Sequence, residues 1–337
     1  MAIDFDAYFK NRKNFSGNIL VAKGDELLWN ESYGYSDREN RVKNTVQTKF
    51  MIGSMTKFLT ALCVAQLSEK KLLSVQQKVE EFFPDFYPTQ GLTVHHLLTH
   101  TSGIPNFVMM KKQIPWQEAH SPEEILRIIQ QHPLKFPAGK KWAYCNTNYL
   151  ILGLIIEKVS GMKYHQYVKE HLFLPAQMTH SGFITEKPED LAINYIGGKK
   201  GFFMDPSMFF ACGDAVSTTG DFYLLDQALQ NGILLEPQTL ENMQQPHYNG
   251  KYIKYGYGLS IKNCFGCKSA GHSGSVPCGY TSHFERYSDS GLFLVVLSND
   301  LVKYSPLSIK ELGGTFISRE IASLIYGKKL SFLDKML

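Results

Sequence analysis

The sequence predicts an α+β fold, a mixed α/β chain in which an antiparallel sheet is flanked by terminal helices and joined to an all-helical lobe. The order of its patterns predicts this: two β-rich runs near the N-terminus, a largely helical middle, then strands with short turns and a last helix. Consecutive strands with short connections form antiparallel sheets, and segregated helices and strands make an α+β arrangement. The expected strands are 16–24, 26–34, 255–262, 268–276, 280–287 and 292–298.

The helices are predicted from their start and stop signals. Ser121 is an N-cap with Pro122 at the first helical position, and a glycine closes the amphipathic run that begins at Asn146. The pair Gly313-Gly314 weakens the first turn of the last helix. The expected helices are 54–69, a short turn at 93–99, 121 to about 131, 146–160, one that follows 218–221 and ends near 230, and about 308–326.

Length and composition indicate one folded domain. The chain has 337 residues, of which 44% are hydrophobic and 20% are charged, as in globular proteins that bury a core. We expect a single domain over 1–337, with a sheet lobe at about 10–50 and 250–330 and a helical lobe at about 60–245. The six scattered cysteines do not suggest a disulfide scaffold, and we expect mostly free thiols.

Charge and hydrophobic runs exclude several kinds of partner. The net charge is +4 and no basic block is interleaved with aromatics, so nucleic-acid binding has no support. No apolar run approaches the ~20 residues that span a bilayer, so no transmembrane segment is expected. Residues 1–6 lack the basic and apolar regions of a signal peptide. The localisation stays open between the cytoplasm and, if a leader is missing from this sequence, the periplasm or the exterior.

The most informative stretch begins at Ser54 and reads Ser-x-x-Lys at the start of a helical run. Residues three apart share a helix face, with Cβ atoms about 5–6 Å apart, so the Lys57 amine can reach the Ser54 hydroxyl. A serine is a poor nucleophile until a neighbouring base takes its proton, and an unprotonated lysine can be that base. The alternative is a solvated lysine on an ordinary helix, because the motif also arises by chance.

A second element, Tyr144-Cys145-Asn146, lies on a loop that enters a helix. A tyrosine beside a cationic amine loses its proton more easily, because the opposite charge favours the phenolate. Tyr144 could therefore relay a proton between Ser54 and a leaving group. Asn146 offers a carbonyl and an amide that could orient Lys57 and a substrate amide. The alternative is a buried tyrosine followed by a helix-capping asparagine.

The third element is His-Ser-Gly-Ser at 272–275, in the C-terminal strands. Gly274 would let a substrate approach the strand backbone closely. The N–H groups of Ser275 and Ser54 could then form an oxyanion hole, which is often the largest contribution to acyl-transfer catalysis. His272 would present a donor or a positive charge to the nucleophile. Alternatively, it is a strand histidine in a polar network.

In this order the three elements resemble the serine β-lactamase and penicillin-binding-protein superfamily. The chain looks closest to its class C β-lactamase-like branch, which also contains D-alanyl-D-alanine carboxypeptidases, D-aminopeptidases and esterases. The resemblance covers nearly the whole chain, from about 16 to 325. Further stretches that resemble the branch are 92–105, 136–139, 144–149, 152–157, 217–221, 255–258 and 295–299.

The resemblance implies a β-lactamase/transpeptidase-like fold, a sheet region plus an all-helical lobe with the site in the cleft between them. It implies that Ser54 is acylated and that Lys57 and Tyr144 share proton transfer, a division that is disputed in related Ser-x-x-Lys enzymes. It also implies that neither a metal nor an organic cofactor is needed.

Two positions depart from the branch. Class C β-lactamases carry Lys-Thr-Gly where this chain has His-Ser-Gly at 272–274. A histidine with an ordinary pKa of ~6.5 is only partly charged at neutral pH, which favours a peptidase or esterase over a β-lactamase. The segment 277–280 has one residue more than the Pro-Gly-aromatic sequence of the branch, so the strand register after Pro277 stays open.

Other motifs compete with this interpretation. One set nearly matches a zinc-knuckle spacing: Cys264, Cys267, His272 and Cys278. The family pattern around His272 favours the hydrolase over zinc. His96 and His100 lack the intervening glutamate of a zinc-peptidase helix and are expected to be structural. Segment 271–275 differs from Gly-x-Ser-x-Gly at its last residue, which argues against an α/β-hydrolase nucleophile at Ser273. Segment 195–201 is Gly-rich but lacks phosphate-loop spacing, so we expect segment 195–201 to be a surface loop.

We therefore expect a serine hydrolase that acts through a Ser54 acyl-enzyme on small amides or esters, most closely a D-alanyl-D-alanine carboxypeptidase or D-amino-acid peptidase. The alternatives are a class C-like β-lactamase or an esterase, and a non-catalytic binding protein that kept the fold. The expected partner is a small-molecule or peptide substrate (a D-amino-acid peptide, a β-lactam or an ester), and the oligomeric state is open. A His272 cation that held a substrate carboxylate would make activity on such substrates fall as pH rises through ~6–7.

Overall fold

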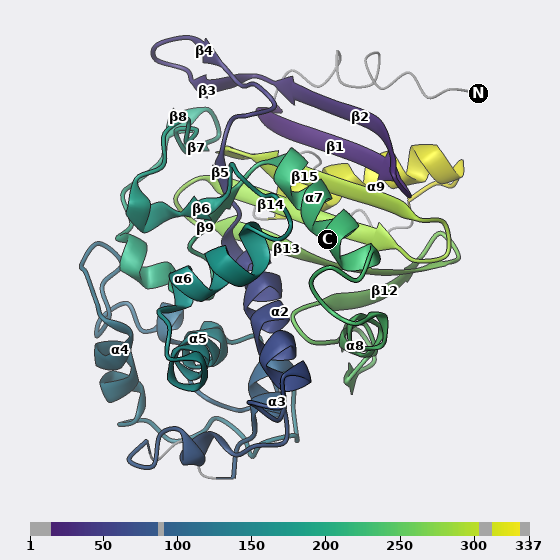
Figure 1. The fold of residues 1–337 in the computed structure, drawn as a ribbon. Coiled ribbons are helices and arrows are strands. Elements are labelled where there is room, and N and C mark those ends of the chain that lie inside the picture. The colour runs from purple at the N-terminus through teal and green to yellow at the C-terminus, as the bar shows by residue number, and fades with distance from the viewer. Residues whose placement is uncertain (1–14, 87–90, 303–311, 331–337) are drawn as a thin grey trace.

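The computed structural model describes residues 15–86, 91–302 and 312–330 and contains an antiparallel sheet with helices on both faces (Figure 1). The eight strands lie in the order β10-β11-β12-β13-β14-β15-β1-β2. The N-terminal hairpin therefore joins the C-terminal strands, as predicted. The bounds are β1 (Gly17–Lys23), β2 (Glu26–Tyr33), β10 (Tyr248–Asn249), β11 (Lys254–Tyr255), β12 (Ser260–Cys264), β13 (Cys267–Val276), β14 (Tyr280–Tyr287) and β15 (Leu292–Ser298).

Both faces of the central strands are buried because helices cover each side. Successive side chains on a strand point to opposite faces. On β1, Ile19 and Val21 pack in the cluster that contains Ile317 of α9 (Gly313–Tyr326). Leu20 lies in the larger cluster, with Phe222 of α7 (Thr219–Gln230). The two clusters make a helix–sheet–helix sandwich, with α7 and α9 on opposite faces in Figure 1.

The second lobe is built around α2 (Thr56–Glu69), which is buried from Thr56 to Leu67 and packs against α5 (Asn146–Ser160). Local signals set the helix ends: Ser121 accepts a hydrogen bond from the Glu124 amide, and Gly161 adopts a left-handed conformation after α5. The other helices are α3 (Val94–Leu98), α4 (Pro122–Ile129), α6 (Tyr164–Val168), α8 (Pro237–Met243), the single turns η1 (Gly53–Met55), η2 (Val79–Glu81), η4 (Phe107–Met109), η6 (Ile184–Glu186) and η7 (Pro206–Phe209), and the π-helix η5 (Lys169–Phe173).

Short strands also occur where no strand was expected, because segments of two or three residues give no detectable periodicity. The predicted strand 255–262 is interrupted between β11 and β12, where Gly258 has φ +70°. Val276 pairs with Tyr280, which settles the register after Pro277. Residues 308–311 of the last predicted helix lie outside the described residues. The short strands are β3 (Tyr35–Asp37), β4 (Val42–Lys43), β5 (Phe50–Met51), β6 (Gly182–Phe183), β7 (Tyr195–Ile196), β8 (Lys199–Lys200), β9 (Ala215–Ser217) and β16 (Asp300–Leu301).

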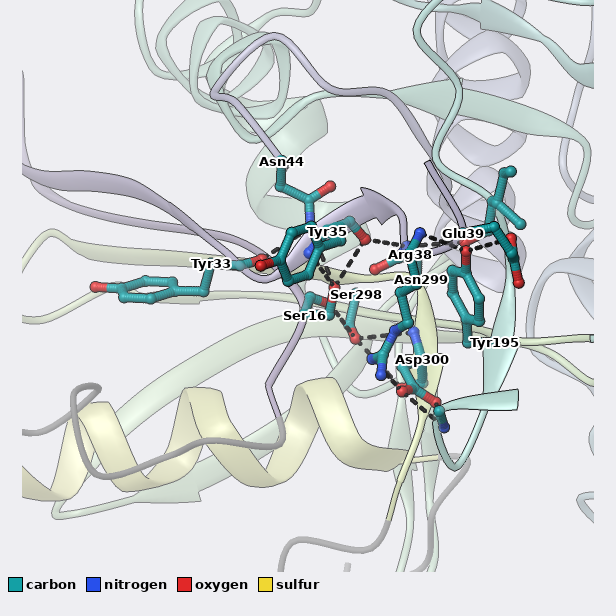
Figure 2. A network of polar contacts seen from close by, with 12 residues as sticks. Ser16, Tyr33, Tyr35, Arg38, Glu39, Asn44, Tyr195, Ser298, Asn299 and Asp300 are labelled. Atoms are coloured by element: carbon teal, nitrogen blue, oxygen red, sulfur yellow. Dashed lines mark hydrogen bonds and ion pairs between the residues drawn. The ribbon is translucent and has the colours of Figure 1, made fainter. Parts of the chain in front are cut away.

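A polar network ties the β3–β4 and β7–β8 hairpins to the end of β15 (Figure 2). The buried Asp300 carboxylate accepts a hydrogen bond from Arg38 at 2.6 Å. Tyr195 accepts one from the Arg38 amide at 2.8 Å. The fully buried Asn299 side chain donates to two carbonyls on separate segments, those of Tyr35 and Ile193. These contacts connect the two hairpins with the end of the large sheet.

Two further features concern the length of the helices and the state of the cysteines. Within the described ranges, no helix is both long and apolar enough to cross a membrane. All six cysteines lie in those ranges as free thiols, and Cys63 is buried in the core as expected.

Candidate active site

Ser54 and Lys57 meet at the junction of η1 and α2, as the sequence predicts. Gly53, with φ +50°, turns the chain from β5 into η1, a conformation that favours glycine. Ser54 follows it on η1, and Lys57 lies in the first turn of α2 with no exposed surface. The Lys57 Nζ atom is 2.9 Å from Ser54 Oγ. The spacing of three residues thus places the amine directly on the hydroxyl.

Two further acceptors fix the Lys57 amine. Its Nζ donates to Asn146 Oδ1 and to the Cys212 carbonyl, each at 2.7 Å. An ammonium would satisfy its three N–H donors with these two oxygens and Ser54 Oγ. A neutral amine has two N–H donors, which the same two oxygens satisfy, and its lone pair then faces the Ser54 hydroxyl. The arrangement therefore suits both states of a lysine that takes and returns the serine proton.

Tyr144 presents a hydroxyl to the same space. Its ring lies with its centroid 5.0 Å from Lys57 Nζ and 4.5 Å from the ring of His100. Its hydroxyl and that of Ser275 are buried without a hydrogen-bond partner among the residues that the structure describes. Buried polar groups are almost always satisfied, and both residues line the same cavity, so a group that enters it could supply the missing partner.

Two hydrogen bonds hold the loop that carries Tyr144. His100, buried and with φ +60°, accepts a hydrogen bond from the Cys145 amide at 3.2 Å, and burial lowers its pKa well below the usual value. The Asn106 side chain accepts one from the Asn146 amide at 3.2 Å. These contacts agree with a structural His100. They also orient Asn146 toward Lys57 at the start of α5.

Gly274 works differently from the expectation. A Cβ added there would lie 2.0 Å from the Ile52 carbonyl oxygen and 2.3 Å from Ser282 Oγ. The space that a side chain would fill is therefore occupied by the chain before Ser54, not left for a substrate. The absent side chain lets β13 approach η1, and a Cβ on Gly53 would be 3.1 Å from the Ser275 nitrogen. Gly274 thus brings Ser275 beside the Ser54 turn.

His272 also differs from the partly charged residue that the sequence suggests. It is 6% exposed, and burial first, then Lys57, lowers its pKa to about 3. Its Nδ1 is 2.6 Å from the Ser273 carbonyl, which can only accept, so Nδ1 carries the proton. Its Nε2 then accepts from the Tyr255 hydroxyl at 3.0 Å. His272 is a neutral residue in a polar network, and the fall in activity through pH ~6–7 is no longer expected.

The predicted residues surround one cavity of about 340 Å³. Ser54, Tyr144 and Asn146 line one side, and the His-Ser-Gly-Ser segment 272–275 lines the other. Lys57 lies beneath, behind Ser54. Four apolar side chains from the segments 106–116 and 182–210 also line the cavity: Val108, Met204, Met208 and Phe209. The cavity can hold a small acyl group against an apolar wall, with the nucleophile at its base.

Neither competing metal motif assembles. No group of three or more histidine, cysteine, aspartate or glutamate residues in the described ranges could hold a metal ion. Cys264 and Cys267 face each other across a hairpin turn, while both ring nitrogens of His272 contact protein groups. The histidine is therefore not available as their partner.

The comparisons with known proteins agree with the geometry. A family model described as Beta-lactamase matches residues 5–309. PbpX of Bacillus subtilis (strain 168), named as a penicillin-binding protein, is 33% identical over an alignment of 301 residues that covers 85% of this chain and 71% of that protein. The Teichoic acid D-alanine hydrolase of Staphylococcus aureus (strain MRSA252) is 27% identical over 91% of this chain and 75% of its own length. The structure of the octameric penicillin-binding protein homologue from Pyrococcus abyssi superposes with a TM-score of 0.82 at 29% identity, covering 96% of this chain and 76% of that one.

Proposed function

The chain belongs to the beta-lactamase family and is a serine hydrolase, and we propose that it cleaves small amides or esters of D-amino acids through an acyl-enzyme on Ser54. The observation that carries the proposal is the set of contacts around Lys57. Two oxygens hold its Nζ so that the third position faces Ser54 Oγ at 2.9 Å. This geometry activates a serine without a histidine or a metal.

The reaction follows from these positions. Neutral Lys57 takes the Ser54 proton as Oγ attacks the substrate carbonyl carbon, and a tetrahedral oxyanion forms. The N–H groups of Ser54 and Ser275 stabilise the oxyanion. Collapse breaks the bond to the leaving nitrogen or oxygen, which receives the proton through Tyr144. Water then attacks the ester on Ser54, releases the acid and returns the proton to Ser54.

The chemistry of the cavity favours substrates that carry no carboxylate beside the scissile bond. A neutral His272 offers no fixed charge for a carboxylate beside the scissile bond, in contrast to a lysine at that position. The Staphylococcus relative is named for hydrolysis of D-alanine from teichoic acid, which supports D-alanine as the acyl group. We therefore rank D-amino-acid esters and amides ahead of D-alanyl-D-alanine peptides and β-lactams.

Turnover of paired enantiomers tests the proposal. We expect hydrolysis of D-alanine methyl ester and D-alanine 4-nitroanilide to exceed that of the L-forms. Ser54→Ala should reduce the rate to background with an unchanged melting temperature, whereas Ser68→Ala, a half-buried serine near the other end of α2, should keep full activity. Full activity of Ser54→Ala would overturn the proposed mechanism. Equal rates for the two enantiomers would overturn the D-specificity.

A β-lactamase remains the second candidate, because the family match carries that description. Incubation with a fluorescent penicillin, intact-mass measurement and peptide mapping separate the possibilities. A stable adduct on Ser54 indicates a site that acylates and releases β-lactams slowly. Consumption of the penicillin without an adduct indicates a β-lactamase. We expect any hydrolysis of the penicillin to be slower than the hydrolysis of D-alanine esters.

A further inference from the structure

A second, larger cavity opens beside the candidate active site. It has a volume of about 590 Å³ and shares the side chains of Tyr144, His272 and Ser273 with the first cavity. Because these residues line both cavities, the two cavities adjoin. An acyl group in the first cavity would leave the other part of the substrate free to extend into the second.

The charge of this cavity is strongly one-sided. Two cationic side chains lie at its exposed rim, Lys251 and Lys254, and two lie deeper, Lys262 and Arg319. Arg319 is 2% exposed, so its charge acts where water screens it little. No aspartate or glutamate in the described ranges lines the cavity.

One carboxylate lies behind the deeper pair. Glu285 is buried, 4.0 Å from Lys262, and accepts a hydrogen bond from Ser269 at 2.7 Å. Burial alone would raise its pKa, but Lys262, His283 and Arg319 together hold that pKa below its usual range. The carboxylate is therefore charged at neutral pH. Of the described residues, four cationic side chains line the cavity and Glu285 lies 4.0 Å from one of them, so the described lining carries an excess of positive charge.

The walls add aromatic surface to this charge. The rings of Trp142 and Tyr255 lie with centroids 5.9 Å apart, and both line the cavity. Tyr252 lies at the rim and is 86% exposed. Flat aromatic faces beside cations accommodate a polyol or peptide that carries a negative group.

We propose that the second cavity is a subsite for the leaving group of the substrate, and that it takes a leaving group with an anion, phosphate or carboxylate, several bonds from the scissile bond. The neutral His272 stands at the scissile bond, and the cations lie beyond it, which sets the position of the charge along the substrate. As a leaving-group subsite the proposal rests on the proposed function, while the anion site can be tested without turnover.

Binding of small probes to the wild-type protein tests the anion site directly. We expect sn-glycerol 3-phosphate to bind more tightly than glycerol by calorimetry, with an affinity that falls as salt is raised. Glycerate serves as the carboxylate probe, so the stronger of the two anions identifies the preferred group. The double substitution Lys251→Gln with Lys254→Gln should weaken anion binding about fivefold, because each exposed pair contributes modestly. Equal binding of glycerol and both anions would overturn the anion site.

A matched double variant controls for net charge. Lys70→Gln with Lys71→Gln removes two exposed lysines that follow the C-terminal end of α2. This variant should leave anion binding within about twofold of wild type. Equal losses in the two double variants would show a general field effect and overturn the subsite. Lys262 and Arg319 are poor first targets, because their loss would leave Glu285 buried with fewer cations.

Turnover separates this inference from the proposed function. The D-alanyl esters of glycerol and of glycerol 3-phosphate share one acyl group and differ in charge. A preference for the phosphate ester that falls about fivefold in the rim variant supports the subsite. Cleavage of both esters at equal rates would overturn the subsite and keep the proposed function. Charge-dependent binding without cleavage of either ester would overturn the proposed function and keep the anion site.

Discussion

Substitution of Gly274 by alanine tests how closely β13 must approach the Ser54 turn. The added Cβ would lie 2.0 Å from the Ile52 carbonyl oxygen, and real Cβ contacts essentially never fall below 3.0 Å, so β13 and η1 must separate by about 1 Å. A misplacement of about 1 Å costs on the order of 100-fold in rate, which is also what loss of one oxyanion-hole donor costs, about 100- to 1,000-fold in kcat. The overpacked contact should lower the free energy of unfolding by about 1–3 kcal/mol.

The assay is kcat on D-alanine methyl ester together with the melting temperature. Gly220→Ala is the matched control, because a Cβ there meets only Thr218 Oγ1 at 3.8 Å on α7. That change should leave kcat unaltered and raise stability by up to about 1 kcal/mol, since alanine is the better helix former. A folded Gly274→Ala enzyme with kcat within threefold of wild type would refute the reasoning, because the Ser275 amide would not need its position.

Three further perturbations address the base, the buried histidine and the polar network. Lys57→Met should lower kcat about 100- to 10,000-fold, because the general base is lost, and fluorophosphonate labelling of Ser54 should become slow; labelling at the wild-type rate would show another base. The unfolding free energy should fall as pH drops from ~6.5 toward 4, because unfolded His272 binds a proton and the buried ring, with its pKa lowered to about 3, does not. The contribution of His272 to the slope is at most about 1.4 kcal/mol per pH unit. Because the buried His100, whose pKa is also lowered, adds to the same slope, His272→Gln should reduce the slope, and an unchanged slope would contradict this assignment. Asn299→Ala should destabilise the protein by about 1–3 kcal/mol in urea titration, because the Ile193 carbonyl loses the Asn299 donor and the Tyr35 carbonyl keeps only that of Ser16; a loss below about 0.5 kcal/mol would show that water replaces it.

Local signals in the sequence carried most of the fold and the centre of the site. The contact between Ser54 and Lys57 follows from helical spacing alone. The helix start at Ser121 follows from a side-chain oxygen that accepts a backbone hydrogen bond, and the helix end at Gly161 follows from the positive φ that glycine adopts. The antiparallel sheet follows from strands separated by short turns. Each of these features is decided by residues close together in the chain, so a single sequence contains the information.

The remaining features depend on partners that are distant in sequence. The Cys212 carbonyl binds Lys57 across 155 positions, and a backbone oxygen leaves no mark on residue type. The charge of His272 is set first by burial and then by Lys57, neither of which its own segment specifies. The packing role of Gly274 depends on the Ile52 carbonyl, a neighbour that a strand pattern does not reveal. Such contacts appear only when the elements are packed.

The burial of α2 divides the molecule by local stability. Because α2 is buried from Thr56 to Leu67, its local unfolding has a high free energy. Its amide hydrogens should therefore exchange with solvent only when the whole domain unfolds. The exposed rim of the second cavity, at Lys251 and Lys254, can open locally at little cost. Substitutions at the rim can therefore alter which leaving group is accepted while the bond-breaking groups stay in place. Changes near Lys57 must instead preserve the fold itself, which makes the rim the more tolerant region for acquiring new substrates.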